Sequence, residues 1–524
     1  MSQTIFWRLV RLDFRERVRR GRFLRAAAAT AALGTLFVPC RTGYVVLTVD
    51  GYRGIYNSAW VGASVALVTT TFLSLFGFYL VGDAVQRDRQ TGVGQVLAAT
   101  PMTKAAYIMS RALSNLALLS ALVGVLAVVA AGMQILRGEA PAIEPWPLLA
   151  PFLLVTLPGL AVIAALAVLF ECIRPLQGTR GNVLYFFVWL TMLALSLSAA
   201  ESAPNGWAFD VFGMGLLVDA IRSALCGYAS PTGAFVLLGI GENAPDTFVW
   251  EGISWSPQLI AVRLLWIPVA ALITALAIPL FDRFEVHPDG HRTTPKRHAI
   301  GPIPPETAPE VPTWLKEGPE KRAAFALAPL VYQELRLMLK GNRFWWNIGA
   351  VVLTLLTYVV PEQAMRWVWL LAWLWPVGLW SQLATKEASS RTEDLILATP
   401  HTLRRHLPAA WLAGLLVALL TGSGAIARLA LSQSWAELAA CLVGAAFIPS
   451  LALALGAAIR NEKPFQILYL LLWYLGPVEG VAYLDFVGLH QESLQLGVPV
   501  LYLILTPLLL IIAALAHRRQ AWGS

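Results

Sequence analysis

The chain has 524 residues, of which 57% are hydrophobic and 13% are charged, and its mean hydropathy is +0.64. Soluble domains contain about 25% charged residues, so this chain carries too little charge to cover a water-facing surface of its own size. The net charge of +8 does not indicate nucleic-acid binding, because the basic residues gather at the ends of apolar segments. The composition predicts an all-α integral membrane protein.

The N-terminal segment is rich in arginine and is not expected to be a cleaved signal peptide. Eight arginines lie within residues 8–25, and no small-residue cleavage site follows a short apolar core. An apolar stripe runs along one helical face: Phe6, Val10, Phe14 and Val18. A second stripe precedes the later half of the chain: Val331, Leu335 and Leu339. Each stripe predicts an amphipathic helix in the plane of the membrane interface.

Largely uncharged runs of about 18 residues or more can cross roughly 30 Å of hydrocarbon. We expect about twelve such spans, arranged as two six-helix repeats. In the first half they cover residues 23–40, 58–82, 112–136, 147–170, 181–200 and 264–281. In the second half they cover residues 344–361, 367–385, 406–427, 438–459, 464–484 and 495–516.

The loops between these runs alternate in charge. The basic ones include Arg87, Arg89, Lys104, Arg174, Arg180, Arg283, Lys296, Arg518 and Arg519, whereas most intervening loops lean acidic. Positive residues favour the cytoplasmic side of a membrane. We therefore expect a multi-pass protein of the cytoplasmic (inner) membrane with both termini in the cytoplasm.

Two segments depart from this pattern. Residues 204–255 are too apolar for a plain outer loop and predict short helices lying at the outer membrane surface or dipping into it. Residues 283–325 contain repeated prolines and predict an extended cytoplasmic linker between a first half, 1–282, and a second half, 326–524. The histidines of this linker lack the cysteine or carboxylate spacing of a metal site.

The four cysteines, Cys40, Cys172, Cys226 and Cys441, form no CxxC pair. The expected topology places Cys40 and Cys226 on the same outer side, which leaves a disulfide between them open. The alternative interpretation is that all four are small apolar residues.

The two halves match each other in the same order along the chain. The stretch from Leu184 to Trp189 is similar to the stretch from Leu468 to Trp473, and an Ile-Arg pair precedes each. The loop from Arg87 to Pro101 is similar to the loop from Lys386 to Pro400. The polar match is the stronger evidence, because apolar sequences match often by chance.

This loop resembles the first cytoplasmic loop of type-2 ABC transporter permeases. That family shows a charged cluster, then Gly-Thr-x-Glu, a leucine-rich step and Thr-Pro. In the first copy the matching residues are Arg87, Asp88, Gly92, Leu97, Thr100 and Pro101; in the second they are Lys386, Glu387, Thr392, Asp394, Leu397, Thr399 and Pro400. Gln95 replaces the family's acid in the first copy, and Arg391 replaces its glycine in the second, so the copies are expected to differ in coupling strength.

The resemblance implies that each loop is a coupling helix resting in a groove of a separate ATP-hydrolysing subunit. A helix is expected to end at Thr-Pro, because the residue before a proline disfavours the α-helical backbone conformation. Val96 and Leu97 are expected to offer apolar contacts, with charges fixing the orientation of docking. The alternative is a solvated loop whose charges only anchor the ends of spans.

The chain has no GxxxxGK[ST] phosphate loop, no HExxH and no GxSxG, so we expect no enzyme activity of its own and no bound cofactor. ATP and Mg²⁺ would be held by the partner ATPase subunits. The other expected contacts are membrane lipids, and a second permease or an accessory protein is left open. The sequence does not name the cargo, although an interior poor in charge favours an amphipathic or lipid-like one.

Ionisable residues in or near spans are functional candidates by default: Glu171, Arg428, Glu437, Glu479 and Asp485. All except Glu479 lie near span ends, where a side chain reaching the interface is the favoured interpretation. Glu479 interrupts an apolar helix and is a candidate for the translocation path. A secondary transporter centred on Glu479 is therefore one alternative function. An intramembrane lipid-modifying enzyme using Asp485 and His490 is the least favoured one.

Overall fold

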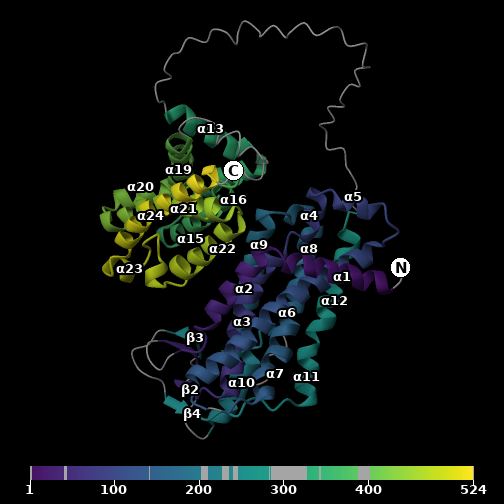
Figure 1. Ribbon diagram of the computed structural model, residues 1–524. Coiled ribbons are helices and arrows are strands. Elements are labelled where there is room, and N and C mark those ends of the chain that lie inside the picture. The colour runs from purple at the N-terminus through teal and green to yellow at the C-terminus, as the bar shows by residue number, and fades with distance from the viewer. Residues whose placement is uncertain are drawn as a thin grey trace, which may run out of the picture. The chain divides into compact units, whose positions relative to one another are not determined.

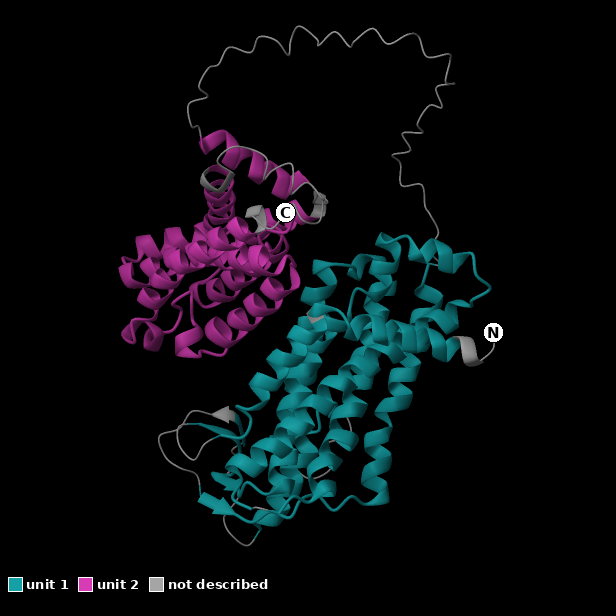
Figure 2. Ribbon diagram, viewed as in Figure 1, with its two compact units in different colours: residues 1–286 teal, residues 287–524 magenta. Residues whose placement is uncertain are grey.

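The computed structural model describes residues 3–39, 44–140, 142–201, 210–226, 235–239, 246–282, 284, 327–340, 344–386 and 402–522. Cys40, most of the proline-rich segment 283–325 and the loop residues 387–400 lie outside these ranges. The chain forms two compact units, Met1–Val286 and His287–Ser524 (Figure 2). Each unit is built mainly of helices (Figure 1).

In the described part of unit 1 the helices are α1 (Gln3–Val18), α2 (Gly21–Gly34), α3 (Ser58–Val81), α4 (Ala84–Gln90), α5 (Val93–Ala98), α6 (Lys104–Arg137), α7 (Pro145–Pro151), η1 (Phe152–Thr156), α8 (Leu157–Cys172), η2 (Arg174–Leu176), α9 (Thr179–Glu201), α10 (Met214–Leu225), α11 (Pro257–Leu264) and α12 (Trp266–Leu280). In unit 2 they are α13 (Leu327–Lys340), α14 (Phe344–Val359), α15 (Glu362–Leu374), α16 (Val377–Ser381), α19 (Thr402–Thr421), α20 (Ser423–Leu431), α21 (Trp435–Ile459), α22 (Lys463–Trp473), η5 (Tyr474–Val478), η6 (Ala482–Leu484), α23 (Gln491–Gln495) and α24 (Val498–Trp522).

Among the described residues, 7 helices are long and apolar enough to cross a membrane, or 8 if one bent pair is a single span. Those 7 helical stretches are Ser58–Gln90, Lys104–Arg137, Pro145–Cys172, Thr179–Glu201, Pro257–Leu280, Trp435–Ile459 and Val498–Arg519. The bent pair joins Arg405–Thr421 to Ser423–Leu431 at 63°. These helices are those of a membrane-embedded protein, and the expected number of twelve spans is not confirmed.

The four remaining expected spans are shorter or broken. α2 and α14 end after 14 and 16 residues. The run expected at 367–385 is interrupted at Pro376, which separates α15 from α16. The run expected at 464–484 leaves helical structure at Glu479 and turns at Gly480, which has a φ of 79°. Proline and glycine end these helices because one lacks an N–H donor and the other adopts the left-handed region readily.

Unit 1 also contains a small sheet, which the sequence analysis did not predict. Its strands are β1 (Val45–Val49), β2 (Tyr52–Gly54), β3 (Phe235–Gly239) and β4 (Asp246–Phe248), in the order β3-β1-β2-β4. β1 pairs antiparallel with β2 and β3, and β2 pairs parallel with β4. Asp50 and Gly51, both at positive φ, form the turn between β1 and β2, as Asp-Gly turns commonly do. Residues 204–255 thus contribute strands as well as the expected helix.

Helix α1 lies against α6 rather than presenting its whole apolar stripe to lipid. Val10, in the middle of that stripe, is buried, and Phe6, Phe14 and Val18 are half-buried. Figure 1 shows α1 crossing the upright helices of its unit. The prediction of an amphipathic helix stands, but much of its apolar face packs on the protein itself.

Two hydrogen-bonding patterns occur in both units. Tyr185 donates to the Ser74 carbonyl (2.7 Å) and Trp189 to the Thr71 carbonyl (3.0 Å). In unit 2, Tyr469 donates to the Trp373 carbonyl (2.9 Å) and Trp473 to the Leu370 carbonyl (3.0 Å). In each unit, therefore, the tyrosine and the tryptophan of a Tyr-x-x-x-Trp segment donate hydrogen bonds to two backbone carbonyls that lie three residues apart on another helix.

The second pattern is a buried aspartate that closes a loop. Asp210 accepts from the backbone N–H groups of Gly213 and Gly215, and Asp485 accepts from those of Gly488 and His490. Gly213 and Gly488 have φ values of 77° and 76°. Asp485 is 1% exposed, so it does not reach an interface as expected; its charge is satisfied within its own loop.

Candidate functional site

The loop that carries the family resemblance in unit 1 folds as two short helices, α4 and α5. They meet at Gly92, whose φ of 74° favours glycine. α5 ends at Ala98, and the Thr100 hydroxyl donates to the Leu97 carbonyl at 2.6 Å just before Pro101. Thr103 then caps α6 by accepting from the Ala106 N–H. The Gly and Thr-Pro positions of the motif thus set where these helices begin and end.

The start of α4 is held by Glu171, at the end of α8. Its carboxylate accepts from the backbone N–H groups of Ala84 (3.1 Å), Val85 and Gln86 (3.2 Å). These groups have no partner within the helix, and a negative charge there is favourable. Glu171 therefore anchors the loop to a spanning helix instead of reaching the interface, which corrects the sequence-based interpretation.

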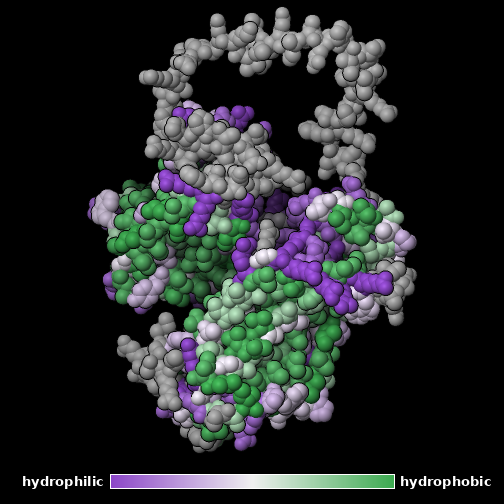
Figure 3. Space-filling view, in the orientation of Figure 1, coloured by the Kyte–Doolittle hydropathy of each residue, from purple (hydrophilic) through white to green (hydrophobic). Residues whose placement is uncertain are grey.

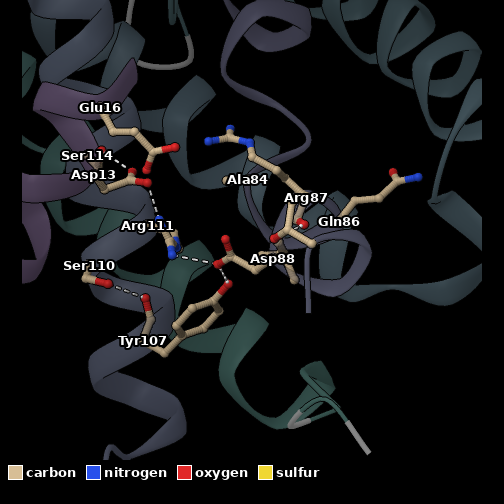
Figure 4. Close-up of polar contacts among 12 residues, drawn as sticks. Asp13, Glu16, Ala84, Gln86, Arg87, Asp88, Tyr107, Ser110, Arg111 and Ser114 are labelled. Atoms are coloured by element: carbon tan, nitrogen blue, oxygen red, sulfur yellow. Dashed lines mark hydrogen bonds and ion pairs between the residues drawn. The ribbon is translucent and has the colours of Figure 1, made fainter. Parts of the chain in front are cut away.

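Asp88 is the buried charge of the loop. Its carboxylate accepts from the Arg111 guanidinium (2.6 Å) and from the Tyr107 hydroxyl (2.6 Å), both on α6 (Figure 4). Asp88 is 7% exposed and Arg111 is 5% exposed. A buried ion pair in such a place resists separation, because each charge left alone would be costly to bury.

Arg111 also joins the loop to α1. Its guanidinium donates to Asp13, which pairs in turn with Arg17 at 3.1 Å and accepts from the Ser114 hydroxyl. Arg17 donates to the Asn115 side chain at 2.6 Å. We call Asp13, Arg17, Asp88 and Arg111 the buried charge network; it contains two acids and two bases.

Burial and charge act in opposite directions on the α1 residues of this network. Burial acts to raise the pKa of Asp13, but Arg17 and Arg111 outweigh it and hold the pKa below the ordinary 3.8. Burial lowers the pKa of Arg17, and Asp13 opposes that shift. Asp13 is therefore ionised at neutral pH, as its pairing with two arginines requires.

The two faces of α5 differ. Val96 is 68% exposed and Val93 is 45% exposed, while Leu97 packs with Phe281 and Tyr107 against the unit 1 core. A Cβ on Gly94 would lie 2.4 Å from the Phe284 ring, so a larger residue there would push α5 away from that ring. Of the two apolar contacts expected from sequence, Val96 projects outward and Leu97 points inward. Gln95 and Arg87 are exposed and half-buried, respectively.

In unit 2 only the first residue of the second loop, Lys386, is described; Glu387, Thr392, Asp394, Leu397, Thr399 and Pro400 lie outside the described residues. Burial lowers the pKa of Lys386, with Glu334 and Glu462 acting in the opposite direction. Glu334 also lies 3.9 Å from His406 at the start of α19. An α13 acid thus faces the helix that follows the second loop.

The residues of the rival functions, Glu479, Asp485 and His490, all belong to unit 2. Glu479 is exposed at the end of η5 and does not interrupt a long helix. His490 lies 3.3 Å from Asp485, and the Ser493 hydroxyl donates to the same carboxylate. Within the described ranges, no group of three or more His, Cys, Asp or Glu side chains could hold a metal.

Sequence reasoning missed Asp13, Tyr107, Arg111 and Glu171 as parts of this site. Arg111 stands one residue before an expected span, and the sequence analysis gave it no role. A signal was available in the leader, where Asp13 is one of only two acids among many arginines. Comparisons with known protein families, with characterised proteins and with solved structures found no match to this chain.

Proposed function

We propose that the chain is the membrane subunit of an ATP-driven exporter of the type-2 ABC kind, with both six-span halves fused in one polypeptide. In this proposal it lies in the inner membrane with both termini in the cytoplasm. Separate ATPase subunits bind ATP and Mg²⁺ and dock on the two loops. The chain itself carries cargo and transmits motion without chemistry of its own.

The observation that carries this proposal is the construction of the α4–α5 loop. Its outer face offers Val93 and Val96 to a partner, whereas its base is fixed to α1, α6 and α8 by Asp88 and Glu171. Exposed apolar side chains beside charged ones are typical of a docking surface. A rigid base would transmit movement of the loop to the spanning helices. A loop that is only solvated would have no need of such a base.

The recurring contacts support the two-repeat arrangement. Arg87 lies 13 residues after Ser74, and Lys386 lies 13 residues after Trp373, so the loop match and the tyrosine contacts share one register. The buried aspartates add a match that sequence reasoning did not use, Asp210-Val-Phe-Gly with Asp485-Phe-Val-Gly. A repeat would give two equivalent loops for two ATPase subunits that close on ATP binding.

Glycines of the apolar helices extend this correspondence. A Cβ on Gly159 of α8 would lie 2.9 Å from the Val211 carbonyl, and one on Gly444 of α21 would lie 2.5 Å from the Phe486 carbonyl. Each carbonyl belongs to the residue after the buried aspartate. The same close approach of loop to helix is expected if both halves share one fold.

Co-purification from the native host tests the proposal. The tagged chain is expected to bring down an ATPase with a phosphate loop and to stimulate its activity. Val96→Asp should lose both, because it places a charge in the apolar contact, and so should the double variant Glu387→Ala/Asp394→Arg. The matched control is Val249→Asp, which changes a similarly exposed valine (60%, against 68% for Val96) beside β4. Recovery of the chain alone, without ATPase, would reject the proposal in favour of a secondary transporter.

A further inference from the structure

Helix α1 carries an exposed arginine face that no described acid neutralises. Arg8, Arg11, Arg15 and Arg19 are exposed, and among the described residues none of them pairs with a carboxylate. The nearby acids are engaged elsewhere: Asp13 with Arg17 and Arg111, and Glu16 with Arg20. A cluster of unneutralised arginines on one helix face attracts anions.

Two apolar side chains flank these arginines. Trp7 is 58% exposed and Leu12 is 64% exposed, on the same outward side of α1. Indole rings are enriched where hydrocarbon meets headgroups, and arginine-rich helices with exposed tryptophan and leucine bind at that level. This mixture fits a membrane surface better than free anions in solution, which would not need the apolar pair.

The position of α1 along α6 places the arginine face at headgroup depth. α6 has 34 residues, about 50 Å of helix, against roughly 30 Å of hydrocarbon. A helix of this length centred in the bilayer would extend about 10 Å past the hydrocarbon at each end. Arg111, to which α1 is tied, lies about 10 Å from the start of α6 at 1.5 Å per residue. Figure 3 shows a hydrophilic band over α1 with hydrophobic surface beside it in the same unit.

We infer that the outward face of α1 is a binding surface for anionic phospholipid headgroups. Arg8, Arg11, Arg15 and Arg19 contact the phosphate and acidic headgroup oxygens, and Trp7 and Leu12 enter the boundary of the acyl chains. The buried charge network holds the opposite face of α1 on α6, so the arginines are presented in a fixed array. This inference does not depend on the partner ATPase.

The proposed binding of anionic phospholipid to α1 is tested by measuring lipid binding to the purified full-length chain in neutral detergent. Dioctanoyl phosphatidylglycerol is titrated and bound lipid is counted by native mass spectrometry, with dioctanoyl phosphatidylcholine as the neutral probe. Each basic residue near an anionic surface strengthens binding by about fivefold. Arg8→Gln/Arg11→Gln/Arg15→Gln should therefore weaken phosphatidylglycerol binding by at least about tenfold and leave phosphatidylcholine binding unchanged.

The control variant Arg180→Gln/Arg518→Gln/Arg519→Gln removes the same charge from exposed arginines at other helix ends. It should retain phosphatidylglycerol binding, as should Arg8→Lys/Arg11→Lys/Arg15→Lys, which preserves the charge. If the glutamine triple variant does not fold, the single variant Arg11→Gln replaces it, with an expected loss of about fivefold. Equal affinity for the two lipids, or an equal loss in the control variant, would overturn the inference.

Discussion

Asp13 of α1 and Asp88 of α4 bind the same guanidinium, that of Arg111 in α6. One side chain in a spanning helix therefore connects a leader helix to a loop that lies 75 residues later in the chain. Both carboxylates are buried, so water does not readily replace the guanidinium as the partner of either one. Under the proposed function, this connection makes the loop, the leader and α6 move as one body.

Removal of the shared arginine should destabilise the loop more than any exposed charge in it. Arg111→Gln removes the guanidinium that both buried carboxylates share, and breaking a buried ion pair costs about 3–5 kcal/mol. We expect a lower thermal midpoint and faster amide exchange in α1 and α4. Arg89→Gln, half-buried in the same loop and outside the network, is the control and should change the midpoint little. Unchanged exchange in α1 would show that the network does not hold the two segments together.

The network should also depend on pH through Asp13. Its pKa in the folded chain lies below 3.8, so its contribution to stability is complete above that pH and is lost as pH falls through the lowered value. The difference in thermal midpoint between wild type and Asp13→Asn should thus be largest near neutral pH and shrink below pH 3.8. A difference that stays constant or grows on acidification would contradict this role.

Gly92 should be needed for the turn between α4 and α5. Its φ of 74° lies in the left-handed region, which costs a residue with a Cβ roughly 1–2 kcal/mol. Gly92→Ala should therefore raise amide exchange across residues 84–98. Gly124→Ala in α6 is the control, since its Cβ would meet nothing within 4 Å and alanine favours helix. Protection of residues 84–98 that is unaffected by Gly92→Ala would show that the turn tolerates other geometry.

Equivalent glycines should respond alike if the two halves are repeats. Gly159→Val and Gly444→Val both force a side chain into a loop carbonyl, and overpacking of this kind costs about 1–3 kcal/mol. Both should lower the thermal midpoint, whereas Gly132→Val, with open space around it, should not. A loss confined to one half would argue against equivalent packing.

The sequence predicted the long apolar helices well, because hydrophobic length alone specifies them. The Thr100-Pro101 step likewise predicted the end of the loop helix, whereas the division into α4 and α5 at Gly92 was not predicted. The pairing of Arg111 with Asp13 could not be read, since the two are 98 residues apart and Arg111 stood at a span boundary. The Asp50-Gly51 turn was a readable hairpin signal, but residues 45–54 fell between the first two expected spans and were treated only as a loop. Leu97 was misjudged because a short helix shows two faces, and only tertiary packing selects the inward one.

The most direct test of the proposed function is photo-crosslinking from the outer face of α5. p-Benzoylphenylalanine in place of Val96, irradiated in membranes of the native host, should capture an ATPase with a phosphate loop, identified by mass spectrometry. The same residue in place of Val249, which is similarly exposed beside the sheet, should capture none. Failure to capture an ATPase from Val96, or equal capture from both positions, would contradict the account that this loop couples the chain to ATP hydrolysis.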